Sequence, residues 1–193
     1  MNFHIIKKIN LMLAILLPAL SGYAQTPTEY YKNADGKKGA ELKTAMSRVI
    51  YKSSNPGYNK LLEMYHTSDK RADGKLWDMY SNTTNFEIGG SAENHQYNKE
   101  GDGYNREHSV PQSWFNENAP MKSDGFHVVP TDGYVNNRRS NHPYGEVGSA
   151  TYTSNNKFSK LGTCTTTGYS GTVFEPNDEY KGDFARIYFY MVT

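Results

Sequence analysis

The chain has 193 residues, with 21 Lys and Arg against 20 Asp and Glu, and a formal net charge of +1 at pH 7. It lacks the net positive charge typical of nucleic-acid-binding proteins, so any phosphate binding must come from a local cluster. The single cysteine, Cys164, excludes an internal disulfide. A catalytic role for Cys164 is not favoured, because it lies in a threonine-rich stretch without a nearby histidine.

The first 24 residues have the layout of a secretory signal peptide. Lys7 and Lys8 precede an apolar run from Ile9 to Leu20, and small residues lead to Ala24, after which we expect cleavage. The apolar run is shorter than the ~20 residues of a membrane span, so a retained anchor is the less favoured alternative. Without Lys7 and Lys8 the mature chain has 19 basic and 20 acidic residues. We expect a secreted or periplasmic protein with no membrane anchor and one domain over residues 25–193.

The first part of the mature chain is predicted to be mainly helical. Thr26-Pro27 is typical of a helix start. Apolar side chains recur at helical spacing from Leu42 to Ile50, which predicts an amphipathic helix over about residues 39–53. A shorter pattern from Leu61 to Tyr65 predicts a second helix. The aromatic-rich run over residues 76–80 predicts a strand.

The centre of the chain predicts a strand, a loop, a second strand and a helix. The polar, glycine-containing residues 93–104 indicate a loop, and extended runs follow at residues 106–110 and 126–129. Thr131-Asp132 can cap a helix that carries residues 134–139.

The last part of the chain is predicted to be irregular and then helical. Residues 150–170 are rich in Thr, Ser, Gly and Asn, which indicates irregular structure. Residues 183–193 have helical apolar spacing that stops without a cap, so we expect the chain to be truncated within a helix. The complete pattern predicts a mixed α+β domain.

Two segments concentrate side chains that can carry hydrolytic chemistry. In the first, Glu107 offers an anionic oxygen ligand beside His108, whose imidazole titrates near neutrality. In the second, Asn136 offers an amide oxygen on the same predicted helix as Arg138 and Arg139. Carboxylate and amide oxygens, with few protein ligands in total, suit Mg²⁺. Arginine forks match phosphate oxygens. A base, a hard metal and arginines are what phosphodiester hydrolysis requires.

Each feature alone has an ordinary explanation. A Glu-His pair is usually part of the surface, two adjacent arginines usually form a solvated helix face, and Asn136 can simply cap or solvate the helix. The spacings of His108, His127 and His142 match no zinc site. Zinc-protease motifs, the serine-hydrolase elbow and the phosphate-binding loop are absent from the sequence.

Taken together, the two segments resemble the bacterial endonuclease I family, exported nucleases of the ββα-metal (His-Me finger) group. In the first block the matching residues are Arg106, Glu107, His108, Pro111 and Phe115. In the second block they are Ser123, Asp124, Pro130, Gly133, Val135, Asn136, Arg139 and Asn141. Residues 174–176 and 182–186 also match, so the resemblance runs from about Trp77 to the end. The ordered pair of blocks is specific, whereas neither block alone is.

The resemblance implies a central ββα-metal motif surrounded by helices. It implies that Glu107 and Asn136 bind Mg²⁺, with Mn²⁺ or Ca²⁺ as candidate substitutes, and that His108 is the general base. Adjacent residues on a regular strand point to opposite faces. Glu107 and His108 can therefore share a site only if the strand is irregular there, which the nearby Pro111 favours.

The two blocks give less support to the roles expected of the remaining polar residues. Arg139 matches the motif and is the expected arginine at the transition state. Arg138, Arg106 and Asn141 are expected to contact substrate. Many family members have histidine where Phe126 stands, and some have a cysteine-containing insert with a separate arginine, which this chain lacks.

The sequence therefore predicts an exported, Mg²⁺-dependent, non-specific endonuclease that hydrolyses DNA, with RNA as a second candidate, to 5′-phosphate products. Substrate contact is expected to be sequence-independent and mainly to phosphate and sugar. Tyr134 and Tyr144 are candidates to stack on bases, with packing as the alternative. No obligate protein partner is indicated. A non-catalytic exported nucleic-acid-binding module is the alternative function, and an adhesive surface protein would explain neither block.

Overall fold

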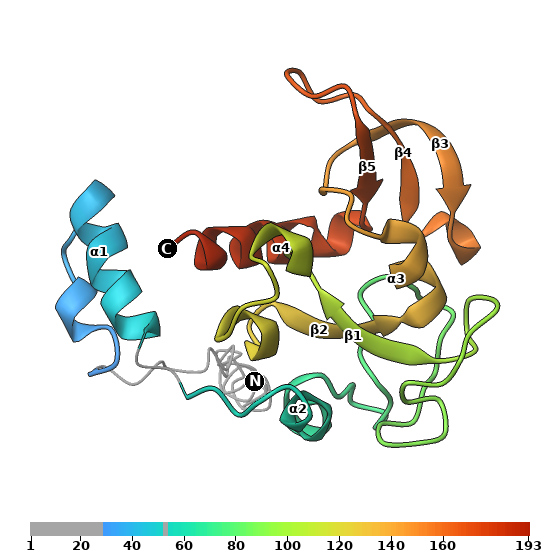
Figure 1. The fold of residues 1–193 in the computed structure, drawn as a ribbon, viewed down its shortest axis with the longest axis horizontal. Helices are drawn as coiled ribbons and strands as arrows, with labels where there is room; N and C mark the ends of the chain where they lie inside the picture. The colour runs from blue at the N-terminus through green and yellow to red at the C-terminus, as the bar shows by residue number, and fades with distance from the viewer. Residues whose placement is uncertain (1–28, 52–53) are drawn as a thin grey trace, which may run out of the picture. The chain divides into compact units, whose positions relative to one another are not determined.

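The computed structural model describes residues 29–51 and 54–193 of the chain. The chain divides into two compact units, Met1–Tyr51 and Lys52–Thr193. The expected signal peptide and the helix start at Thr26-Pro27 lie outside the described residues. In the first unit, α1 (Gly39–Ile50) confirms the predicted amphipathic helix (Figure 1). Within the described ranges, no helix is both long and apolar enough to cross a bilayer.

The second unit is a mixed α+β domain, as the sequence predicts. Its strands form a two-stranded antiparallel sheet, β1-β2, and a three-stranded antiparallel sheet, β3-β4-β5 (Figure 1). Its elements are α2 (Lys60–Ser68), β1 (Tyr104–His108), β2 (Val128–Asp132), α3 (Gly133–Arg139), β3 (Val147–Thr153), β4 (Lys160–Cys164), β5 (Thr172–Glu175) and α4 (Asp178–Met191).

The β1-β2 pair and α3 follow one another in the order that the resemblance implies. The pairing runs without a register shift from Tyr104 opposite Asp132 to His108 opposite Val128. Asp132 then caps α3, because its side chain accepts a hydrogen bond from the Val135 N–H at 2.9 Å. The chain thus passes directly from β2 into α3, and α3 contacts both strands.

Strand β2 is buried on both faces. Its neighbouring residues Val128 and Val129 point to opposite sides and belong to different apolar clusters. The cluster around Val128 includes Leu61 and Tyr65 of α2. The cluster around Val129 includes Phe184 of α4. The strand therefore joins two cores, and its register determines which side chain enters each core.

Two predictions of secondary structure are wrong. Residues 76–80 form a loop with bends and an isolated bridge at Leu76. The buried Asp78 carboxylate accepts hydrogen bonds from the N–H groups of Tyr80 and Ser81, and these bonds bend the backbone away from a strand. Residues 150–170 are not irregular throughout, since they include most of β3 and all of β4. Threonine is compatible with strands, and antiparallel pairing with β5 supplies the partners that the local sequence does not reveal.

Candidate active site

A polar pocket of about 270 Å³ lies where the end of β1 meets α3. It brings together three side chains from the two sequence blocks: Glu107, His108 and Asn136. Arg106, Arg139 and Asn141 also border it. Among the expected site residues, Arg138 is the one that does not line this pocket.

The Glu107 carboxylate is almost completely buried and is held by charged and neutral donors. Its Oε1 atom accepts hydrogen bonds from the Tyr80 hydroxyl and from Arg139 Nη1, each at 2.6 Å. Burial raises the pKa of Glu107, while Arg139 and hydrogen bonds from Tyr80 and Asn136 oppose that rise. Burial also raises the pKa of Tyr80 well above its usual value, so this hydroxyl stays protonated and donates.

Asn136 is oriented by a second amide. Its Nδ2 atom donates to Asn105 Oδ1 at 2.7 Å, and this bond directs the Asn136 side chain toward β1. Asn105 precedes Glu107 by two residues on β1, so both side chains lie on the same face of the strand. The side chains of Glu107 and Asn136 therefore meet in one pocket.

His108 lies on the opposite face of β1 from Glu107. Its ring packs parallel to Tyr58, with centroids 5.9 Å apart, and its Nε2 atom lies 3.0 Å from the carbonyl oxygen of Lys122. A carbonyl can only accept, so Nε2 carries the proton and Nδ1 is left with a lone pair. Burial lowers the pKa of His108 to about 4, and the imidazole is therefore neutral at pH 7.

The expected irregularity of β1 at Glu107 and His108 is wrong. The strand pairs regularly with β2 as far as His108, and the two side chains point to opposite faces. Both nevertheless border the pocket, because His108 is the last residue of β1 and the strand ends at the pocket wall.

Arg139 is not a solvated arginine available to substrate, contrary to expectation. It is 1% exposed, and its guanidinium pairs with Glu107 and donates to the carbonyl oxygens of His108, Ser109 and His142. With its nitrogens directed to these acceptors, it clamps the end of β1 to the end of α3. The structure therefore gives Arg139 the position of a residue that holds Glu107.

The other expected substrate-binding residues differ in their surroundings. Arg106 packs over the Tyr58 ring, with its guanidinium carbon 3.8 Å from the centroid, and donates to the Tyr58 carbonyl. Arg138 is exposed outside the pocket and packs over Tyr134 at 4.7 Å. Asn141 is exposed at the pocket rim.

His127 lies behind His108 rather than in the pocket. It is fully buried, its ring meets that of His108 edge-on with centroids 5.6 Å apart, and its Nε2 atom lies 2.6 Å from the Met121 carbonyl oxygen. The preceding Phe126 is 64% exposed. This buried contact indicates that His127 holds the ring of His108, the candidate general base, in place.

The donor set of the pocket is compatible with Mg²⁺. Glu107 brings a carboxylate and Asn136 an amide oxygen, and both side chains border the pocket. Two protein ligands suit Mg²⁺, which keeps several waters and shares its shell with phosphate. Over the described part of the chain, no group of three or more His, Cys, Asp or Glu side chains is arranged to hold a metal.

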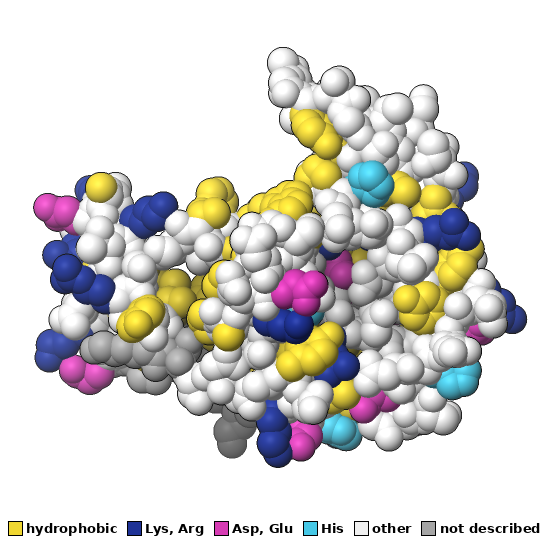
Figure 2. Space-filling model, viewed as in Figure 1, with side chains coloured by type: hydrophobic (Ala, Val, Ile, Leu, Met, Phe, Trp, Pro, Cys, Tyr) yellow, Lys and Arg dark blue, Asp and Glu magenta, His cyan; other side chains and the backbone are white. Residues whose placement is uncertain are grey.

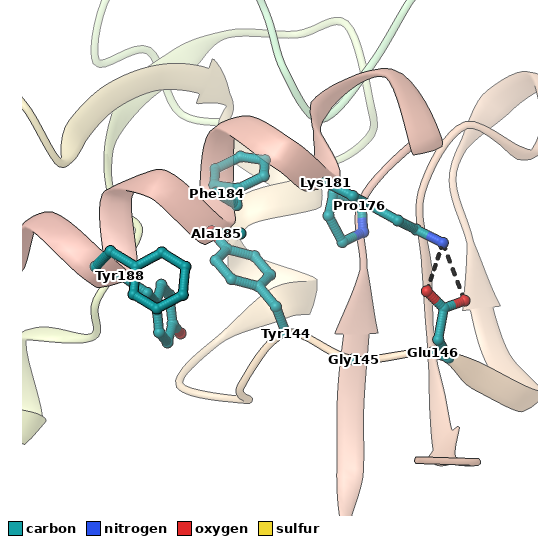
Figure 3. A pocket seen from close by; sticks show the side chains of 9 residues that line it. Tyr144, Gly145, Glu146, Pro176, Lys181, Phe184, Ala185 and Tyr188 are labelled. Atoms are coloured by element: carbon teal, nitrogen blue, oxygen red, sulfur yellow. Dashed lines mark hydrogen bonds and ion pairs between the residues drawn. The ribbon is translucent and has the colours of Figure 1, made fainter. Parts of the chain in front are cut away.

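A cavity of about 340 Å³ next to α4 has a different chemistry (Figure 3). Tyr144, Phe184 and Tyr188 pack along it, and a Lys181–Glu146 ion pair at 2.8 Å closes one end. Its lining is mainly apolar, so it does not assemble a base with metal ligands. On the face of the molecule in Figure 2, basic side chains are interspersed with acidic ones, in line with the near-neutral composition.

Three residues that support the site were not identified from the sequence. Tyr80 binds Glu107, Asn105 orients Asn136, and Tyr58 packs on both His108 and Arg106. A signal existed only for Asn105, which directly precedes the predicted strand and lies two residues before Glu107. Tyr80 and Tyr58 are far from the motif blocks in sequence, and their role depends on tertiary packing.

Comparison with known proteins identifies the family. The chain matches the profile described as Endonuclease I over residues 38–193. It is 30% identical over 187 residues to the extracellular ribonuclease of Bacillus amyloliquefaciens and 29% identical over 186 residues to that of Bacillus subtilis (strain 168). These alignments cover 92% and 94% of this chain but 58% of each relative, so the chain spans little more than half of their length. No solved structure matches the chain. The chain belongs to the endonuclease I family.

Proposed function

We propose that this protein is an exported, Mg²⁺-dependent endonuclease that hydrolyses phosphodiester bonds of nucleic acid without sequence preference. The observation that carries the proposal is the pocket in which Glu107, His108 and Asn136 meet. Membership of the endonuclease I family supports it. The two relatives are named extracellular ribonucleases, so RNA stands beside DNA as a candidate substrate and export is a consistent expectation.

In this proposal His108 is the general base. Its Nε2–H is engaged with the Lys122 carbonyl, which leaves Nδ1 to take the proton from the attacking water. The stacking of Tyr58 and the buried contact with His127 hold the ring in one orientation. A neutral, fixed imidazole at the pocket wall meets the requirements of a base for in-line attack on phosphorus.

Glu107 and Asn136 would hold Mg²⁺, which when bound stabilises negative charge on the phosphate and on the leaving 3′-oxygen. Arg139 acts as a positioning residue, because its ion pair favours the ionised form of Glu107 and fixes the carboxylate at the pocket. Arg106 brings a positive charge to the pocket wall, where it favours the approach of phosphate. The group released on the upstream side is a 3′-hydroxyl, and the downstream product carries a 5′-phosphate.

Cleavage of supercoiled plasmid and of single-stranded RNA tests the proposal. The wild-type protein is compared in Mg²⁺ and in chelator with His108→Ala, and with His95→Ala as a control that removes an exposed histidine outside the pocket. We expect Mg²⁺-dependent cleavage by the wild type and His95→Ala, and a loss of about 10²- to 10⁴-fold in His108→Ala. Cleavage that survives His108→Ala would place the base elsewhere. Nucleic-acid binding without cleavage under any divalent metal would instead favour the non-catalytic binding module.

A further inference from the structure

A second pocket, of about 510 Å³, adjoins the candidate active site. Its walls come from the 3-10 helix η2 (Gln112–Trp114), from the segment that follows α3, and from the loop between β4 and β5. Three large aromatic side chains line it, Trp114, Tyr144 and Tyr169, of which Trp114 and Tyr169 are exposed. We call it the aromatic pocket.

The two pockets are adjacent along two separate stretches of chain. Pro111 and Gln112 border the polar pocket, and Trp114 in the same short helix borders the aromatic pocket. On the other side, Asn141 borders both pockets, and His142 continues into the aromatic one. A polymer whose phosphate lies between Glu107 and His108 would therefore extend directly into the aromatic pocket.

The aromatic rings are exposed although they are held in place. Trp114 is 52% and Tyr169 is 48% exposed. The Trp114 ring meets Tyr188 edge-on, with centroids 6.2 Å apart, and Tyr188 in turn packs against Tyr144. The Tyr169 ring lies over Gly171, where a side chain would collide with it. A large ring that is exposed and yet fixed from behind offers a ready-made stacking surface.

We propose that the aromatic pocket binds an unpaired nucleobase of the strand being cut, next to the scissile phosphate, and so makes single-stranded nucleic acid the preferred substrate. This inference rests on the proposed nuclease function. A base in a duplex is stacked and paired, so it cannot present its face to Trp114 or Tyr169, whereas an unpaired base can. Stacking on aromatic side chains tolerates every base, in agreement with cleavage that ignores sequence. Asn141 and Thr166 supply polar groups at the pocket for the base edge or the sugar.

The test compares substrates that share phosphates but differ in bases. A short single-stranded oligonucleotide, its duplex, and a strand of the same length built from stable abasic residues are cleaved by the wild type, Trp114→Ala and Tyr169→Ala. Phe126→Ala serves as a control, because it truncates an aromatic ring that is 64% exposed and lies outside both pockets. The measured quantity is the ratio of kcat/KM for the single-stranded oligonucleotide to that for the abasic strand.

We expect the wild type and Phe126→Ala to cut the single-stranded oligonucleotide faster than either other substrate. In Trp114→Ala and Tyr169→Ala the ratio should fall by about 5- to 150-fold, mainly through KM, as loss of one stacking contact implies. A ratio that is unchanged in both variants overturns the inference, as does an equal loss on the abasic strand, which would mean that the rings only shape the catalytic pocket.

A binding measurement separates this inference from the proposed function. In His108→Ala with Trp77→Phe, Trp114 is the remaining tryptophan, and its fluorescence reports occupancy of the aromatic pocket. Quenching by the single-stranded oligonucleotide, but not by the abasic strand, supports the subsite even if the wild type cuts nothing and the proposed function fails. Equal quenching by both strands, or none by either, overturns it.

Discussion

Replacement of Arg139 by methionine is expected to be among the most destabilising single changes in this chain. The guanidinium is 1% exposed and forms a buried ion pair with Glu107 at 2.6 Å. It also donates to three backbone carbonyls, those of His108, Ser109 and His142. Methionine fills a similar length of the site but leaves the Glu107 charge and these acceptors without their donor.

Breaking one side of a buried ion pair costs about 3–5 kcal/mol, against about 0–1 kcal/mol for an exposed pair. A domain of this kind is stable by about 5–15 kcal/mol, so Arg139→Met should remove a large part of its free energy of unfolding. The measurement is urea-induced unfolding followed by tryptophan fluorescence and far-ultraviolet circular dichroism. Arg138→Met is the matched control, because its guanidinium is exposed one residue away, and we expect a change within about 0.5 kcal/mol.

A double-mutant cycle identifies the ion pair as the cause. Glu107→Gln keeps an acceptor for Tyr80 but removes the charge, so in this background Arg139→Met should cost less than it does in the wild type, by about 0.5–3 kcal/mol. Additive losses would mean that packing or the backbone contacts dominate. If Arg139→Met costs no more than Arg138→Met, the assignment of Arg139 as a buried clamp is refuted.

Three further results are expected. Asp78→Ala should destabilise the protein by about 3 kcal/mol or more in urea unfolding, because it leaves the buried N–H groups of Tyr80 and Asp132 without an acceptor. Asp78→Asn should cost less, since its amide oxygen can still accept. Equal stability of both variants and the wild type would contradict this expectation. Burial lowers the pKa of His127 below its usual 6.5, with the Met121 carbonyl and Asp124 opposing the shift, so its neutral form contributes stability that is present above pH 6.5 and is lost as the pH falls. The difference in unfolding free energy between wild type and His127→Gln should therefore shrink between about pH 7 and about pH 5, and a difference that grows would reverse the argument. Asn105→Ala should weaken the affinity for Mg²⁺ by about 10- to 100-fold in calorimetric titration, since it frees the Asn136 amide from its orienting bond; an unchanged affinity would remove Asn105 from the site.

The sequence predicts those parts of the fold that depend on local pattern. Helical spacing from Leu42 to Ile50 and the Asp132 cap describe α1 and the start of α3 correctly. The strand over residues 76–80 fails because one buried carboxylate, Asp78, bends the chain, and that burial depends on contacts 54 residues away at Asp132. Strand β4 was not predicted because its stability comes from pairing with β3 and β5, which its local sequence does not reveal.

The site shows the same division between local and tertiary information. The two blocks indicate which residues can meet, and Glu107, His108 and Asn136 do line one pocket. The burial of Arg139 was not predicted, although it follows Val135 by four residues and so shares the helix face that enters the core. Adjacent arginines look alike in a sequence, and only the helix orientation decides that Arg138 faces solvent.

Because Glu107 and His108 point to opposite faces of β1, the geometry of the site depends on the register of β1 against β2. A slip of β1 by one residue would exchange their faces, turning the imidazole toward Arg139 and the carboxylate toward Tyr58. Val128 and Val129 on the partner strand resist such a slip from their separate cores. Substitutions far from the pocket that loosen either core would therefore abolish the proposed catalysis before they unfold the protein, because they would misalign Glu107 and His108.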